Sequence, residues 1–220
     1  SHLTEIDTEA KHPFMKLSDV RSRISPDLQD LSTKLLDLAT ASWNAFKHSP
    51  EVTQELAKDP FTGPIKEQSG IAECLLLLLH ICDRVASAAL RATVTEHAAA
   101  TLRHSLMSAL VGATIPAFVQ AACPDEEEDE QEETQTDLLH LYNARAIQYG
   151  FFALGASQSP HESEALLTVA SIRLAEALEA AENADIIGHG MEVVITSVET
   201  LRERLPLKGV IGRMIAGARE

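Results

Sequence analysis

One segment, from Ile71 to Val94, constrains the fold most, because it is apolar on nearly every helical face and still carries charged side chains. It contains five leucines in succession, Leu75 to Leu79, and His80, Asp83 and Arg84 follow within five residues. A helix that is apolar almost all round is buried in the protein, and a buried charge has to be paired or neutralised. We therefore expect this segment to be the central helix of the fold and to carry a polar site.

The composition favours helices over strands. Of the 220 residues, 45% are hydrophobic but only 4% are aromatic, so alanine and leucine must supply most of the core packing. Both residues are strong helix formers, and no stretch shows the apolar–polar alternation of a half-buried strand. The predicted fold is all-α, an irregular bundle of about six or seven helices.

Ser-Pro pairs mark three of the predicted helix starts, because Ser caps a free backbone N–H and Pro suits the first turn. Pro116 is expected to kink the helix that contains it. The glycines of Gly188-His189-Gly190 predict a hinge between two helices. The predicted helices span 25–48, 49–58, 71–94, 96–122, 135–154, 159–182, 191–204 and 207–218.

The N-terminal residues 1–24 are polar and weakly periodic, which predicts a loosely ordered arm with a short helix near 14–20. Ser1-His2 is typical of the remnant of a purification tag. Residues 25–220 are then expected to form a single helical domain.

The charge balance disfavours two classes of partner. The formal net charge is −15, whereas nucleic acids and anionic membranes are bound by basic patches. We therefore expect neither a nucleic acid nor a membrane as a partner. Eight of the acids lie between Asp125 and Glu133, and without them the charge is −15 + 8 = −7, an ordinary value for a soluble domain.

This acidic run predicts a solvated loop over 124–134, since like charges at this density repel one another and resist ordering. Two alternatives remain, a docking surface for a basic protein partner and a weak site for hard cations. The central glycine of an EF-hand loop is missing from the run.

The three cysteines, Cys74, Cys82 and Cys123, are odd in number and lie in apolar stretches. They are expected to be reduced thiols, with Cys123 at a helix end the most reactive. No N-terminal signal pattern is present, and the segment 71–94 holds too many ionisable groups for a membrane span. These features predict a cytoplasmic protein.

Helical spacing sorts the charges of the central segment onto two faces. One stripe is mostly polar and is expected to be solvated; it consists of Glu73, Leu77, His80, Arg84 and Arg91. Asp83 lies on a different face, among leucines. It is expected either to form a salt bridge with a neighbour or to be buried, holding a cation or a basic side chain.

Arg145 is the predicted partner of Asp83. It shares a helical face with Leu138, Tyr142, Tyr149 and Phe152, and an arginine can stack on tyrosine rings while clamping a carboxylate with two bonds. Three interpretations stay open: an architectural buried salt bridge, an anchor for a small carboxylate or phosphate ligand, and an exposed Arg145. The candidate cluster is His80, Asp83, Arg84, Tyr142, Arg145 and Tyr149.

The pattern His80-x-x-Asp83-Arg84, followed about sixty residues later by Tyr142-Asn143-x-Arg145-x-x-x-Tyr149, resembles an uncharacterised family of bacterial all-helical proteins. The resemblance covers about residues 70–155. It implies a helical fold, a bacterial source and no assigned activity, and it groups these residues as one connected cluster. The acidic run between the two parts departs from the compact spacing of that family.

The sequence predicts no metal, cofactor or catalytic residue. Helical di-iron sites repeat Glu-x-x-His, which is absent here, and His97 and His104 lie about 10 Å apart along a helix axis, too far to share an ion. Zinc-ligand spacing, a nucleophile elbow and a phosphate-binding glycine loop are also missing. An acid–base enzyme using His80 and Asp83 is an alternative, but no nucleophile or cofactor motif accompanies them.

The predicted function is a non-enzymatic interaction module that forms a homo-oligomer through an Ala/Leu-rich helical face. The C-terminal helix supplies part of such a face, with Val210, Ile211, Met214 and Ile215. The alternative is a small-ligand-binding or sensing domain whose pocket between the central helices is lined by His80, Tyr142, Arg145 and Tyr149. An enclosed pocket there would favour ligand binding, whereas a filled core would favour the interaction module.

Overall fold

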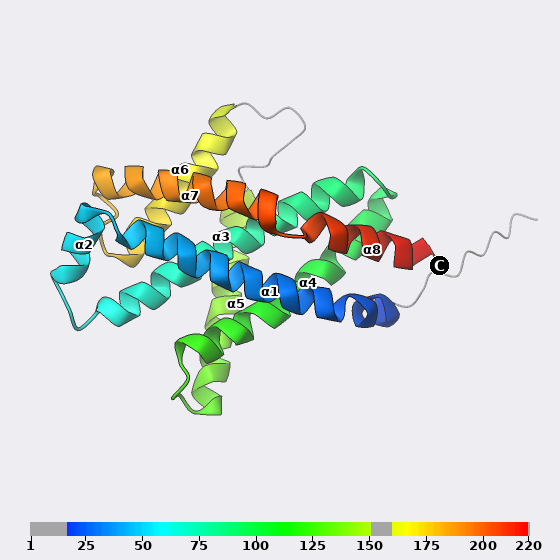
Figure 1. Cartoon of the computed structure of the whole chain (residues 1–220), viewed down its shortest axis with the longest axis horizontal. Coiled ribbons are helices and arrows are strands. Elements are labelled where there is room, and N and C mark those ends of the chain that lie inside the picture. The colour runs from blue at the N-terminus through cyan, green and yellow to red at the C-terminus, as the bar shows by residue number, and fades with distance from the viewer. Residues whose placement is uncertain (1–16, 151–159, 220) are drawn as a thin grey trace, which may run out of the picture.

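The computed structural model describes residues 17–150 and 160–219, with side chains described over 25–150 and 165–217. This part of the chain forms eight helices and no strand, so the predicted all-α bundle is confirmed (Figure 1). The helices are α1 (Leu17–Lys47), α2 (Pro50–Ala57), α3 (Gly63–Arg91), α4 (Glu96–Ala122), α5 (Glu128–Gly150), α6 (Pro160–Ala177), α7 (Ala184–Arg204) and α8 (Leu207–Arg219).

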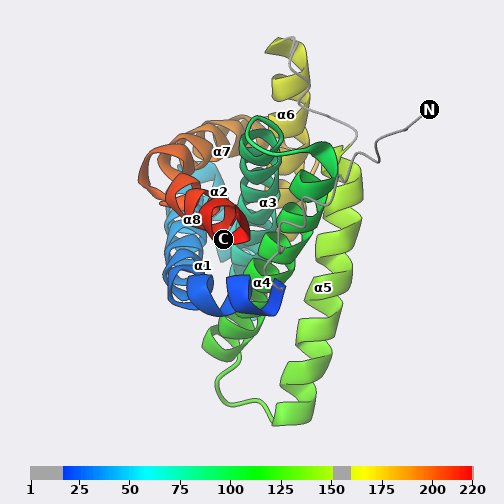
Figure 2. The same ribbon diagram turned by 90° about the vertical axis from the view of Figure 1, so that its right-hand side faces the viewer.

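Helix α3 is the centre of the bundle and packs against all seven of the other described helices. Every residue from 72 to 82 is buried, which confirms the prediction of a buried central helix. Helices α1, α7 and α8 run roughly along the long axis of the molecule, whereas α5 crosses that direction steeply (Figure 1). Figure 2 shows α5 along one edge of the molecule, where it contacts α3 and α4.

The close approach of α1 to α3 depends on a glycine. A Cβ atom on Gly70 would lie only 2.1 Å from the ring of Trp43, which is itself fully buried. No side chain larger than hydrogen fits between the two helices at this point. Gly70 and Trp43 therefore fix the distance at which α1 and α3 pack.

Several predicted boundaries are confirmed. Helix α2 begins at Pro50 and is capped by Ser49, whose hydroxyl accepts a hydrogen bond from the N–H of Val52 at 3.2 Å. Helix α4 begins directly after Thr95, and α8 begins directly after Pro206.

The predicted start at Ser25-Pro26 is wrong, because α1 begins at Leu17 and runs through Pro26. Proline removes one backbone donor, and a long helix that packs along its length can continue past one missing bond. Residues 17–24 are therefore helical and do not belong to a loose arm, and residues 1–16 lie outside the described part of the chain.

The predicted loop over 124–134 is also wrong in its second half, because α5 begins at Glu128. Its first turn holds Glu128, Asp129 and Glu130, where the positive end of the helix dipole stabilises carboxylates. The acids between 125 and 133 are exposed, as predicted. The predicted helix end at 154 lies outside the described residues.

The predicted hinge at Gly188-His189-Gly190 lies inside α7, which begins after Asn183. The Asn183 side chain caps the helix by accepting hydrogen bonds from two backbone N–H groups. Gly190 serves packing, since a Cβ atom there would lie 3.2 Å from the Cβ of Ser171 on α6. The glycine therefore marks a close helix contact and not a break.

Helix α4 is the one helix of the described part that is long and apolar enough, by length and composition, to cross a membrane. Half of its most apolar window is buried inside the bundle. Core helices of soluble proteins pass the same test.

Candidate functional site

The polar stripe of α3 is buried, contrary to the prediction that it is solvated. Glu73 is 9% exposed and His80 6% exposed. Helix α5 crosses α3 here and covers the stripe. Only its last member, Arg91, is exposed. Each buried charge on this stripe therefore needs a partner from another element.

Glu73 finds its partner in Arg145 of α5. The Arg145 Nε donates to Glu73 Oε2 at 2.9 Å and Nη2 donates to Oε1, which makes a two-bond clamp. Both side chains are at most 15% exposed. The hydrogen bonds with Glu73 raise the pKa of Arg145 above its usual range. The pair links the middle of α3 to α5.

Asp83 pairs with Arg103 of α4, so the predicted pair between Asp83 and Arg145 is wrong. Arg103 Nε donates to Asp83 Oδ1 at 2.6 Å and Nη2 donates to Oδ2. Helical periodicity correctly separates Asp83 from the stripe of Glu73, and the two carboxylates bind arginines on different helices, α4 and α5. Tyr142 lies nearby, and burial raises its pKa to about 12.

His80, Arg84 and Tyr149 form a connected group, as the candidate cluster predicts. Arg84 Nε donates to His80 Nε2 at 2.7 Å, and Arg84 Nη2 donates to the backbone carbonyl of Tyr149. The Tyr149 ring lies 5.1 Å from the imidazole in a tilted arrangement. Burial and the Arg84 guanidinium lower the pKa of His80 to about 4. The imidazole is therefore neutral and accepts at Nε2, which assigns its proton to Nδ1.

Two polar atoms of this group are buried without a hydrogen-bond partner, the Tyr149 hydroxyl and Arg84 Nη1. Burial, followed by the Glu73 carboxylate, raises the pKa of Tyr149, so the hydroxyl stays protonated. An unpaired buried hydroxyl costs roughly 1–3 kcal/mol. Linking α3 to α5 does not require these two atoms to be buried without partners.

The core beside the cluster is nearly filled. One cavity of about 10 Å³ lies between α1, α3, α6 and α7, and its lining includes Glu73, Ser42 and Ser197. That volume holds about one water molecule. The two serine hydroxyls lie 2.6 Å apart, and each also lies within bonding distance of a carbonyl on its own helix. The cavity is far smaller than the roughly 300–1,000 Å³ of a ligand pocket.

The sequence thus identifies six residues of which the structure joins three directly. Two residues that complete the ion pairs, Glu73 and Arg103, are absent from the predicted cluster. Glu73 was visible as a member of the polar stripe of α3. Arg103 had no comparable signal, because a single arginine on an otherwise mixed helix does not indicate its partner.

The predicted C-terminal interaction face is wrong as well. The four apolar residues of α8 are at most 8% exposed, because α8 packs against α1 and α3. They are Val210, Ile211, Met214 and Ile215. This stripe is part of the core and is closed to a partner.

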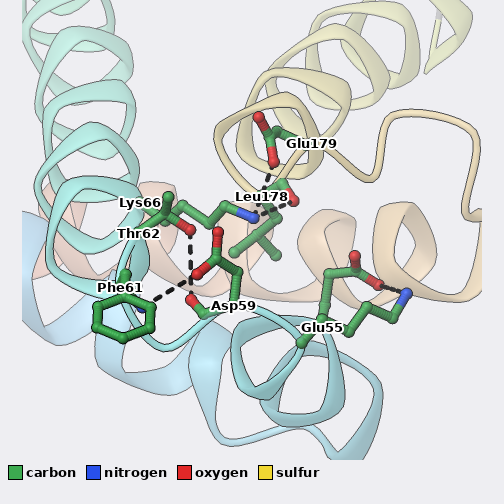
Figure 3. A network of polar contacts seen from close by, with 8 residues as sticks. Glu55, Asp59, Phe61, Thr62, Lys66, Leu178 and Glu179 are labelled. Carbon is green, nitrogen blue, oxygen red and sulfur yellow. Dashed lines mark hydrogen bonds and ion pairs between the residues drawn. The ribbon is translucent and has the colours of Figure 1, made fainter.

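The exposed apolar surface lies instead at the turn between α2 and α3. Phe61 is 92% exposed, the highest value among the large hydrophobic residues described, and Ile65, four residues further on, is 65% exposed. Figure 3 shows the Phe61 ring pointing away from the neighbouring polar side chains. We call Phe61 and Ile65 the apolar tip.

Polar contacts hold the apolar tip in place. Asp59 Oδ1 accepts a hydrogen bond from the N–H of Phe61 at 3.1 Å, and Thr62 donates to the Asp59 carbonyl at 3.3 Å. One turn further along α3, buried Lys66 pairs with Glu179 at 2.9 Å and lies 3.5 Å from the Leu178 carbonyl (Figure 3). The turn is therefore fastened to the C-terminal end of α6.

Glu179 has a left-handed backbone, with φ of 61°, the one non-glycine residue of the described part with positive φ. This conformation ends α6 at Ala177, before the predicted end at 182, and normally favours glycine. The ammonium group of Lys66 contacts both the Glu179 carboxylate and the Leu178 carbonyl at this end of the helix, where a cation is favoured by the helix dipole.

No group of three or more residues able to ligate a metal is present in the described ranges. All three cysteines there are free thiols. Burial raises the pKa of Cys74 and of Cys82 to about 12. Cys123 is half-buried and thus the most accessible of the three, as predicted.

No protein-family model, curated protein or solved structure matches this chain. The resemblance of residues 70–155 to bacterial helical proteins therefore stays a prediction. The function has to be argued from the geometry of the bundle.

Proposed function

We propose that this chain is a non-enzymatic, cytoplasmic helical module that associates with further copies of itself. The apolar tip carries the proposal. A phenylalanine that is 92% exposed leaves its ring in water unless a partner covers it. The turn that presents the ring is anchored by hydrogen bonds and by the ion pair of Lys66.

An anchored backbone suits binding, because the turn that presents the ring loses little conformational freedom on association. Aromatic residues are also enriched among the residues that dominate interface energies. The filled core near the central cluster supports the same function, since a cavity of about 10 Å³ admits no metabolite. In this view the pairs of Glu73 with Arg145 and of Asp83 with Arg103 are architectural.

A small-ligand-binding domain is the second candidate function. One observation favours it, namely the buried Tyr149 hydroxyl and Arg84 Nη1 without partners. A polar group of a bound molecule beside either atom would supply the missing partner. The exposed acids between 125 and 133 also suit a basic protein partner, through charge alone.

Native mass spectrometry of the untreated purified chain tests these functions together. Self-association predicts multiples of the 23.9 kDa chain mass with no retained compound. A reproducible extra mass that disappears in Arg84→Ala but persists in Lys34→Ala, a change to an exposed pair elsewhere, would favour the ligand-binding function. A single chain mass at every concentration would contradict self-association.

A further inference from the structure

We infer that the apolar tip of one copy inserts Phe61 into a basic-rimmed hollow at the α7–α8 junction of the next copy, in a head-to-tail arrangement. The inference rests on the proposed self-association and specifies its contact. We call the receiving site the junction hollow; its lining is Val85, Leu201, Arg202, Leu205, Leu207 and Lys208.

The size of the junction hollow fits one aromatic ring. Its volume is about 180 Å³, below that of typical small-molecule pockets. An apolar cavity of about 150 Å³ is known to accept benzene, which is the size of a phenylalanine ring. The leucines at 201, 205 and 207 are buried and give the hollow an apolar floor.

The rim of the junction hollow is basic. Arg202 and Lys208 are both exposed, and no ion pair joins either of them to another side chain of the described chain. Each cation is thus free to contact a partner. A neutral, purely apolar partner would make no ion pair with these two cations. An apolar residue surrounded by acids would pack on the leucines of the floor and pair with the cations of the rim.

The surroundings of the apolar tip have the opposite charge. The open surface beside the turn includes Glu55, Glu176, Glu179 and Glu182. The first three pair with cations of their own chain, so the excess negative charge here comes from Glu182 and from Asp59 in the turn. Figure 3 shows Glu55, Asp59 and Glu179 in the same corner as Phe61. An exposed aromatic ring on an acidic surface is therefore the counterpart of an apolar hollow with a basic rim.

The contact has to be intermolecular. The α2–α3 turn lies at the left end of the bundle in Figure 1, whereas the α7–α8 junction lies in its right half. Phe61 cannot reach the hollow of its own chain, because both sites belong to packed helices of one bundle. Two different patches in contact make a heterologous interface, which closes into a ring or grows into a chain of subunits.

A mixing experiment with two single variants tests this contact. Phe61→Ala removes the inserted ring but keeps the hollow, and Val85→Phe fills the hollow but keeps the ring. Sedimentation velocity is run on the wild type, on each variant and on an equimolar mixture, from micromolar to millimolar concentration. Ile147→Ala, at a site 68% exposed on α5, is the matched control for losing an exposed hydrophobic side chain.

We expect the wild type and Ile147→Ala to form oligomers, and each interface variant alone to associate at least roughly 30-fold more weakly. The mixture should form a heterodimer that grows no further, because only one intact ring and one intact hollow can meet. If Val85→Phe fails to fold by circular dichroism, Lys208→Glu takes its place as the variant with an impaired hollow.

The possible failures separate the two claims. Oligomers that persist in Phe61→Ala would overturn this contact and leave self-association standing. Monomeric variants whose mixture also stays monomeric would overturn the head-to-tail arrangement. A wild type that is monomeric throughout would overturn both the contact and the proposed function.

Discussion

His80 gives the molecule a titrating group in its core. The imidazole is neutral and accepts a hydrogen bond from Arg84, and its pKa is lowered to about 4 from the usual 6.5. The unfolded chain therefore binds this proton at a higher pH than the folded chain does. Folding stability contributed by the neutral His80 is complete above about pH 6.5 and is lost as the pH falls towards 4.

We predict that this loss amounts to about 3 kcal/mol between those limits. Urea unfolding at several pH values measures it. The control is His80→Gln, which keeps an acceptor for Arg84 but cannot titrate, so its stability should fall less steeply. Parallel pH profiles for the two proteins would show that His80 does not titrate as described.

The Glu73–Arg145 pair should behave as a buried pair. Arg145→Ala leaves the Glu73 carboxylate without its partner, and we predict a loss of about 3 kcal/mol in the free energy of unfolding. Lys34→Ala, which breaks a surface pair that is about half exposed, should cost less than about 1 kcal/mol.

Replacing both buried partners, as in Glu73→Leu with Arg145→Met, should recover much of that loss, because no uncompensated charge remains. A double variant as unstable as the sum of its single changes would show that the two side chains act independently.

At the level of single elements, helix packing decides where glycine is required. Gly70→Ala would drive a methyl group into the Trp43 ring, and we predict a loss of at least about 2 kcal/mol. Gly188→Ala is the matched control, since nothing lies within 4 Å of the added carbon. Inside a helix this change should stabilise the protein by about 0.5–1 kcal/mol. Destabilisation by Gly188→Ala would instead support the predicted hinge at this glycine, which the continuous helix α7 contradicts.

The helices themselves were predictable, and their ends less so. The apolar content of 71–94 and the Ser49 cap correctly indicate α3 and α2. The errors arise where a local signal for a break lies inside a helix: Pro26 in α1, the acids at the start of α5 and Gly188 in α7. At each of these points, continued helix packing or the helix dipole outweighs the local preference.

The candidate site was predictable only in part, for a related reason. Spacing along α3 places Glu73, His80 and Arg84 on one stripe, but spacing along one helix does not show which helix crosses it. Arg145 and Arg103 could therefore not be assigned to their carboxylates from the sequence. The apolar tip carried no periodic signal at all, because one phenylalanine in a turn has no pattern to follow.

At the level of the whole molecule, the bundle has an acidic end with an exposed ring and a basic-rimmed hollow elsewhere. The central polar cluster fastens α5 to α3 through Arg145 and Arg84. Its role in this account is structural, and self-association takes place at the surface. Rising salt should weaken self-association, since the Debye length shrinks to about 3 Å at 1 M. Sedimentation velocity at low and high salt measures this effect, and association that strengthens with salt would indicate a purely apolar contact.

The most direct measurement is a photo-cross-link from position 61. A p-azidophenylalanine, which keeps a single ring, replaces Phe61, the protein is mixed with an isotope-labelled copy, and the cross-linked peptides are identified by mass spectrometry. We predict cross-links from position 61 to residues 201–208 that join labelled with unlabelled chains. Cross-links confined to one chain, or directed to another surface of the second copy, would contradict the head-to-tail account.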